Sequence, residues 1–143
     1  MPESSQNADL RAKLLKYASF LLARKPYFSS QIRKKLLDKQ ASISEVNNQE
    51  TVDEIIADLV KAKYLNDKYL LLGFIRQKLK KLQGPKIITY KLKMLGLSSR
   101  QIQQALDQDE IKELVAESIQ SLTKKYSIED QFKAKAKLYQ RGF

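Results

Sequence analysis

Residues 84–97 read GPKIITYKLKMLGL, and a fragment of this stretch occurs three times in the chain. Within it, Ile88 and Leu92 are separated by three residues, and a lysine stands immediately before the leucine. The same pattern recurs at residues 32–36 and, with alanine in the first position, at residues 134–138. A fragment that persists while the linkers change length indicates a tandem helical repeat, and such repeats usually bind extended partners. The predicted core positions of the repeat are Ile32, Leu36, Ile88, Leu92 and Leu138.

Apolar residues recur every three to four positions along most of the chain, which predicts amphipathic helices. Four glycines and three prolines are too few for a β-rich architecture with many tight turns. In the first repeat, Pro26 ends the first helix, and Ser29 or Ser30 caps a second helix that runs to about residue 40. Thr51 and Glu54 match a capping box, which predicts the start of a third helix.

The second repeat carries equivalent boundary signals. Asn66 is the expected N-cap of its first helix, and Pro85 suits the first turn of its second helix. Gly96 is expected to end that second helix in a left-handed conformation. Ser98 and Gln101 then form a capping box for a third helix.

These signals predict an all-α protein built as an elongated, curved array of tandem three-helix repeats. A disordered tail is expected over residues 1–9, and the first repeat over residues 10–65. The second repeat is expected over residues 66–108. The third, residues 109–143, is predicted to have two helices and to lack its last one.

The composition favours binding over catalysis. A formal charge of +11, a pI of about 9.7 and 43% hydrophobic residues describe a chain that folds and still carries a surplus of positive charge. The chain has no histidine and no cysteine, and it shows no glycine-rich phosphate loop. We therefore expect no enzymatic activity, no metal and no cofactor. The sequence shows no secretory signal or membrane-spanning stretch, so a cytoplasmic monomer is expected.

Basic residues concentrate on the second helices of the repeats and on the segment before the second of them. Between residues 67 and 97, eight lysines and arginines accompany a single acid, Asp67. Because this excess recurs at equivalent helices, it favours a binding surface over a merely solvated face. The predicted partner-binding or nucleic-acid-binding residues are Arg33, Lys34, Lys35, Arg76, Lys80, Lys81, Lys86, Lys91, Lys93, Lys133 and Lys137. Most aromatics are expected to pack between helices, with Tyr90 as the exception.

Four motifs in order carry a family resemblance. They are Leu-Leu-Ala-Arg-Lys-Pro26 followed by Gln31-Ile32-Arg33-Lys34-Lys35-Leu36, then Tyr64-Leu65-Asn66-Asp67, then Gly84-Pro85-x-x-Ile88-x3-Leu92-x3-Gly96-Leu97, then Lys137-Leu138-x-x-Arg141-Gly142-Phe143. Together they span nearly the whole chain, which resembles the RecX regulators of the RecA recombinase. The resemblance implies a three-repeat helical protein that lies in the groove of the RecA–DNA filament. It further implies restraint of strand exchange, ATP hydrolysis and co-protease activity.

The sequence departs from the family pattern in three places. Phe28 and Gln31 stand where relatives often have a serine and a glutamate, which is expected to move the cap to Ser29. The family's final helix and most of its N-terminal extension have no counterpart here.

A second interpretation stays open beside the RecA filament. The basic helices also suit a direct DNA- or RNA-binding module without a RecA partner, or weak direct contact with DNA in addition to RecA. Lysine-rich helices favour phosphate or acidic-surface contact over the reading of base edges, but charge alone does not separate the two hypotheses.

Overall fold

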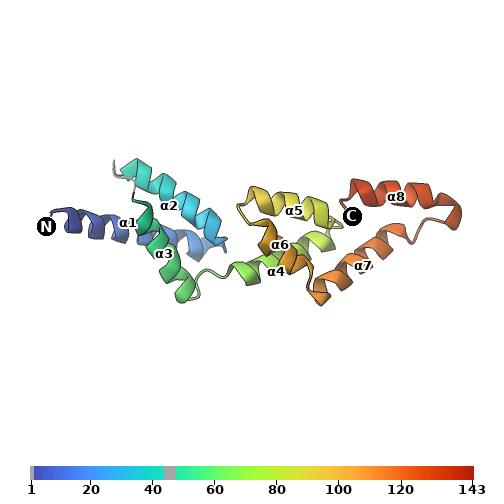
Figure 1. Ribbon diagram of the computed structural model, residues 1–143, viewed down its shortest axis with the longest axis horizontal. Helices are drawn as coiled ribbons and strands as arrows, with labels where there is room; N and C mark the ends of the chain where they lie inside the picture. The colour runs from blue at the N-terminus through green and yellow to red at the C-terminus, as the bar shows by residue number, and fades with distance from the viewer. Residues whose placement is uncertain (1, 44–47) are drawn as a thin grey trace. The chain divides into compact units, whose positions relative to one another are not determined.

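The computed structural model describes residues 2–43 and 48–143, and all regular structure in them is helical (Figure 1). The elements are α1 (Pro2–Arg24), α2 (Ser29–Ile43), α3 (Gln49–Lys61), α4 (Asp67–Lys80), α5 (Pro85–Met94), α6 (Ser99–Leu106), α7 (Asp109–Thr123), the short 3₁₀ helix η1 (Ile128–Asp130) and α8 (Gln131–Gln140). The predicted all-α fold class is confirmed. Turns between helices fall at both expected repeat boundaries, although the division into repeats stays a prediction.

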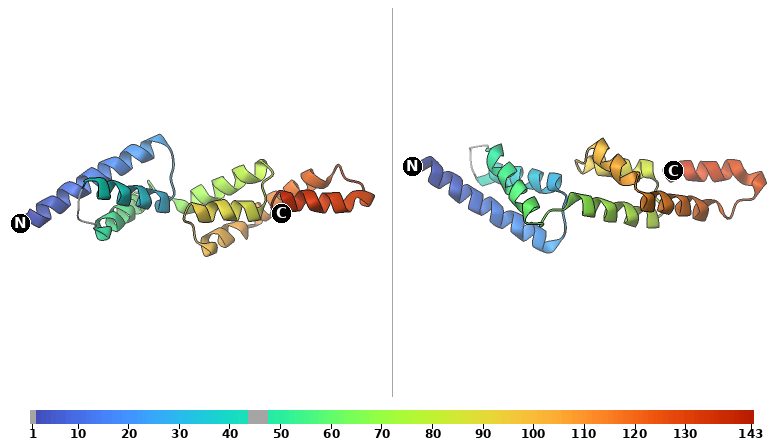
Figure 2. Two further views of the ribbon diagram at one scale, coloured as in Figure 1. Left: turned by 90° about the horizontal axis from the view of Figure 1, so that it is seen from above. Right: turned by 60° about the horizontal axis from the view of Figure 1, so that its bottom comes forward.

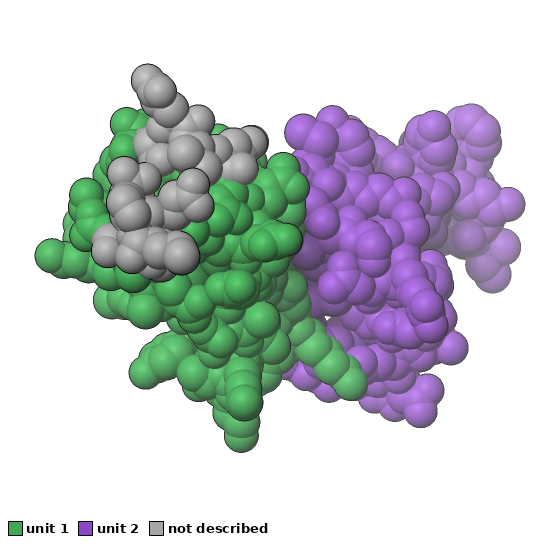
Figure 3. Space-filling view, turned by 60° about the vertical axis from the view of Figure 1, so that its left-hand side comes forward, with its two compact units in different colours: residues 1–70 green, residues 71–143 purple. Residues whose placement is uncertain are grey.

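The chain forms two compact units, residues 1–70 and residues 71–143 (Figure 3). In the first unit α1, α2 and α3 pack against one another (Figures 1 and 2). Their core consists of Leu10, Leu14, Ala18, Leu21, Ile32, Leu36, Val52, Ile55, Leu59 and Leu65. Arg11 on α1 adds ion pairs to Glu54 (2.7 Å) and Asp58 on α3. Because both acids are exposed, the apolar core supplies most of the stability of this bundle.

In the second unit, α5 packs on α6, α6 on α7, and α7 on α8. Its fully buried side chains are Ile75, Leu79, Ile88, Leu92, Ile102 and Ile111. Four of the five predicted repeat positions are therefore confirmed as core, because Ile32, Leu36, Ile88 and Leu92 are all 0% exposed.

The fifth predicted core position is wrong. Leu138 is only half-buried, and Ala134 fills the buried position of the third fragment. Among the described residues α8 packs against α7, η1 and the amino end of α5. These contacts cover Ala134 and leave Leu138 partly exposed.

The amino-terminal boundary also differs from the prediction. Helix α1 begins at Pro2, whereas a disordered tail was expected over residues 1–9. No glycine or internal proline interrupts the chain between Pro2 and Leu10, so the helix continues outward from its packed part. Residue 1 lies outside the described residues.

Two predicted caps of the first unit are replaced by others. Asn48, and not Thr51, caps α3: its Oδ1 accepts from the Thr51 N–H at 3.3 Å, and Thr51 is buried inside the first turn. Residues 44–47 of the preceding polar stretch lie outside the described residues. Ser29 is the first residue of α2, and its N–H and hydroxyl both donate to Asp67 Oδ1 at 2.7 and 3.1 Å. A carboxylate from α4 thus takes the place of a Ser29 cap.

The boundary signals predicted for the second repeat are confirmed. Asn66 Oδ1 accepts from the Tyr69 N–H at 3.2 Å, and Pro85 occupies the first turn of α5. Ser98 and Gln101 form the expected capping box. These caps depend on contacts within a few residues, so the local sequence is sufficient to predict them.

Four helix ends in the described chain share one geometry, in which a residue after the helix adopts a left-handed conformation. These residues are Lys63 (φ 66°), Leu82 (φ 59°), Gly96 (φ 93°) and Gly142 (φ 87°). At the end of α3, the Tyr64 N–H donates to the Leu59 carbonyl at 2.9 Å and the Lys63 N–H to Val60 at 3.0 Å. Glycine adopts this conformation without a steric cost, whereas an L side chain loses about 1–2 kcal/mol.

Replacing Lys63 with glycine is therefore expected to stabilise the protein by roughly 0.5–1 kcal/mol. The Lys63 side chain is exposed, so little packing is lost. Chemical denaturation of the full chain measures the change. Ala57→Gly, at an exposed position inside α3, is the control and should destabilise by about 1 kcal/mol. Equal destabilisation by both glycines would contradict the prediction.

Candidate basic interface

The exposed face of α5 carries two lysines and an aromatic ring. Ile88 and Leu92 point into the core, which turns Lys86, Tyr90 and Lys93 toward solvent. Tyr90 is 67% exposed, which confirms the expectation that it lies off the core face. The helix therefore presents cations and a π-face on the same surface.

The expectation that most other aromatics pack between helices holds for only part of the set. Five further rings are more than half exposed: Phe20, Tyr64, Tyr69, Phe132 and Tyr139. Several exposed or half-buried rings lie beneath cations, and Lys86 Nζ is 5.6 Å from the centre of the Tyr139 ring. This contact brings a cation of α5 beside an aromatic of α8.

The amino end of α5 meets the carboxyl end of α8 (Figure 1). The Gly84 N–H donates to the Arg141 carbonyl at 2.6 Å, and the Lys86 N–H donates to the Gly142 carbonyl at 3.0 Å. A Cβ on Gly84 would lie 2.4 Å from the Gly142 carbonyl carbon, so the two backbones approach this closely only with glycine. The junction places the last turn of α8 beside α5.

A basic pocket of about 360 Å³ opens beside this junction. Its lining residues are Gln83, Ile87, Lys91, Lys137, Gln140 and Arg141. Three are cations, two are amides and none is a carboxylate. Lys91 Nζ donates to Gln83 Oε1 at 2.8 Å, which holds the ammonium at the pocket wall. We call this the α5–α8 pocket. Two residues predicted to bind a partner, Lys91 and Lys137, are brought together here from positions distant in sequence.

Positive charge accumulates around the same helices. Burial lowers the pKa of Lys78, and the charges of Lys91 and Lys81 lower it further. Three ammonium groups thus repel one another, which favours the approach of an anion.

Two predicted arginines are engaged by acids within the chain. Arg76 on α4 forms a forked ion pair with Glu110 on α7, Nε to Oε1 at 2.6 Å and Nη2 to Oε2 at 2.9 Å. These hydrogen bonds lower the pKa of the Glu110 carboxyl. Arg33 on α2 pairs with Asp53 on α3 at 2.9 Å. Both guanidinium groups therefore link helices within their own unit.

The remaining predicted cations differ in exposure. Lys34, Lys80, Lys81 and Lys133 are exposed. Lys35 is half-buried, and its ammonium lies 5.7 Å from the Tyr27 ring centre. The cations of α2 belong to the first unit and those of α4, α5 and α8 to the second.

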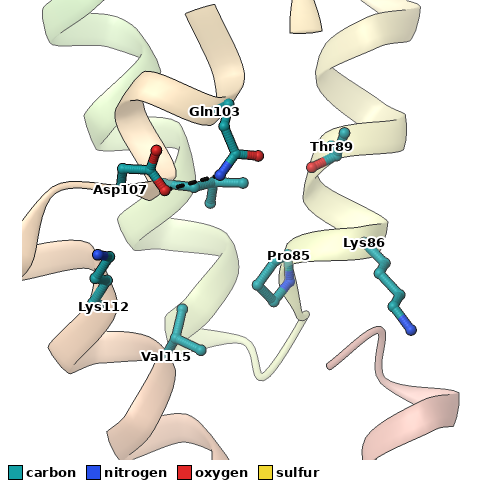
Figure 4. Close-up of a pocket in the computed structure, with 8 residues that line it drawn as sticks. Pro85, Lys86, Thr89, Gln103, Asp107, Lys112 and Val115 are labelled. Carbon is teal, nitrogen blue, oxygen red and sulfur yellow. Dashed lines mark hydrogen bonds between the residues drawn. The ribbon is translucent and has the colours of Figure 1, made fainter. Parts of the chain in front are cut away.

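A second pocket, of about 560 Å³, lies between α5, α6 and α7 (Figure 4). Its apolar lining comes from Pro85, Leu106 and Val115. Gln103 Nε2 donates to Asp107 Oδ1 at 2.8 Å on one side, and Lys86 extends from α5 away from the centre (Figure 4). With an acid on its wall, this pocket is less suited to an anion than the α5–α8 pocket.

Sequence reasoning did not select Arg141 and Gln83 as site residues. Arg141 directly precedes the glycine of the third fragment, and Gln83 directly precedes Gly84. The two glycines were the available signal, because a close helix contact at them places both neighbours at the pocket.

No described helix is long and apolar enough to cross a membrane.

The chain was compared with protein families, with curated proteins and with solved structures. No protein-family model matches the chain. The chain is 28% identical over 132 residues to the regulatory protein RecX of Photobacterium profundum, covering 90% of this chain and 47% of that protein. It is also 28% identical over 133 residues to the regulatory protein RecX of Actinobacillus pleuropneumoniae serotype 5b, covering 90% of this chain and 83% of that protein. The chain thus spans about half the length of the first relative and most of the second.

Two crystal structures share the fold. One, of regulatory protein RecX, superposes with a TM-score of 0.73 at 23% identity, covering 99% of this chain and 70% of that chain. The other, of RecX from Lactobacillus salivarius, gives a TM-score of 0.68 at 26% identity, covering 95% of this chain and 90% of that chain. Sequence similarity over 90% of the chain and the shared all-helical fold thus point to the same proteins, and the chain is similar to RecX regulatory proteins.

Proposed function

We propose that this protein regulates the RecA recombinase by binding the RecA filament on DNA and slowing its ATP hydrolysis and strand exchange. The observation that carries the proposal is the basic surface of α5 and α8 in a chain that is similar to RecX regulatory proteins. A filament assembled on DNA is polyanionic, and a cationic surface whose pocket has no carboxylate is attracted to it.

The proposed contacts are the predicted cations without an acidic partner among the described ion pairs. They are Lys34, Lys35, Lys80, Lys81, Lys86, Lys91, Lys93, Lys133 and Lys137. Arg33 and Arg76 instead support the surface by tying helices together. In this proposal the protein acts as a monomer and by binding alone, without chemistry of its own.

Addition of the full chain to a cognate RecA filament on single-stranded DNA is expected to reduce the rate of ATP hydrolysis by more than half at saturation. The reduction should weaken as salt rises, because screening weakens contacts between exposed charges. A coupled ATPase assay at low and high salt measures both effects. An unchanged rate at saturating protein and low salt would exclude the proposed regulation.

Direct binding to single-stranded DNA or RNA is a second candidate, favoured by the exposed rings of Tyr90 and Tyr139 beside Lys86. A binding assay with bare single-stranded DNA and with the same DNA coated by RecA separates the two. The regulator binds the coated strand more tightly, whereas a nucleic-acid module prefers the bare strand, where the bases are accessible.

A further inference from the structure

The α5–α8 pocket has more hydrogen-bond donors than the protein itself satisfies. Lys91, Lys137 and Arg141 supply two ammonium groups and a guanidinium, and Gln83 and Gln140 supply amide groups. Gln83 accepts from Lys91 through its oxygen, which leaves its amide N–H groups for another acceptor. In the described part of the chain, none of the ion pairs includes these three cations.

The backbone N–H groups do not supply the attraction for an anion at the α5–α8 pocket. The first N–H groups of α5 would normally attract an anion, but Gly84 and Lys86 donate theirs to the last carbonyls of α8. The two helix ends therefore neutralise each other, and the positive potential of the pocket comes from side chains. The lowered pKa of Lys78, partly caused by Lys91, is consistent with an uncompensated field here.

We propose that the α5–α8 pocket binds one phosphate group, with Lys91, Lys137 and Arg141 as its charged ligands. A phosphate monoester or inorganic phosphate offers three or four oxygens and about 1.5 to 2 negative charges at neutral pH, and the pocket offers three cations and two amides. A carboxylate has one charge and two oxygens, so it leaves most of these donors unused. A phosphodiester has one charge and two free oxygens, and is expected to bind less tightly than a monoester.

This site does not depend on the regulation proposed above, because it requires no recombinase. The phosphate can come from a free ion, a mononucleotide or the terminus of a nucleic-acid strand, since all three present the same group.

Titration of the full chain at constant ionic strength tests the site. The probes are inorganic phosphate, adenosine 5′-monophosphate, a dinucleotide with only an internal phosphodiester, and acetate, with binding followed by ³¹P or protein amide NMR. We expect the two dianions to bind at least about tenfold more tightly than the diester or acetate. Their affinity should rise between pH 5 and pH 7.5 as the phosphate loses its second proton.

Variants with equal loss of charge localise the site. Lys137→Gln with Arg141→Gln should weaken phosphate binding at least about tenfold. Lys124→Gln with Lys135→Gln, which removes two exposed lysines outside the pocket lining, should leave it within about twofold. Equal weakening by both pairs, equal binding of acetate, or no binding of either dianion by the unaltered protein would overturn the proposal. Diester binding as tight as monoester binding would also overturn it and would assign the pocket to a nucleic-acid backbone.

Discussion

Reversal of Lys81, Lys86 and Lys93 to glutamate is expected to weaken binding to the RecA filament by at least about 100-fold. The three side chains are exposed, and no described ion pair includes them. The change replaces three attractive charges by three repulsive ones on the surface around α5, and like-charge contacts across an interface cost several kcal/mol. Folding should be retained, because none of the three contributes to the core. Equilibrium binding to the coated filament, with circular dichroism as a folding check, measures the effect.

The matched control reverses Arg100, Lys112 and Lys124 in the same unit. These three are also exposed, and Lys112 lies among acids near the start of α7, so the change in net charge is the same but the location differs. We expect the control to lose less than about tenfold in affinity. Equal losses in both triple variants would show that net charge alone governs binding, and the localised basic surface would be rejected.

Leu92→Ala is expected to have the largest effect on stability. Leu92 is 0% exposed and forms the repeated Lys-Leu position of α5, next to the fully buried Ile88. Removing three carbon atoms from such a site costs the transfer free energy and leaves a cavity, together about 2–5 kcal/mol. Denaturant unfolding followed by circular dichroism measures the loss.

Met94→Ala on the same helix provides the comparison, because Met94 is 72% exposed. It should change stability by less than about 0.5 kcal/mol. If Leu92→Ala were as mild as Met94→Ala, the orientation of α5 derived from the repeat would be incorrect.

The sequence alone was sufficient for features that depend on near neighbours. The period of the apolar residues predicted helices throughout, and the caps at Asn66, Pro85 and Ser98 lie where they were predicted. Asn66 and Ser98 each accept from a backbone N–H three residues later, so these two caps need no tertiary contact. The repeated fragment likewise located Ile88 and Leu92 in the core, because helical spacing fixes which side chains share a face.

Only the tertiary structure decided features that depend on residues far apart in the chain. Ser29 does not cap α2 as expected, because the carboxylate of Asp67, 38 residues later, accepts from the Ser29 N–H at the start of that helix. Leu138 is half-buried, although its spacing in the repeated fragment predicts a core position, because burial depends on which faces of α8 its neighbours cover.

The same distinction applies to the candidate site. The charge pattern predicted Lys91 and Lys137 as partner-binding residues on two separate helices, and it did not place them together. Their meeting depends on the close backbone contact between Gly84 and Gly142, which also adds Arg141 and Gln83 to the pocket. Equally, the partner of Arg76 is Glu110, 34 residues away, and a charge pattern cannot show which cation is already paired. A local sequence determines helices and their faces through short-range geometry, whereas the fold determines which faces meet and which charges remain available.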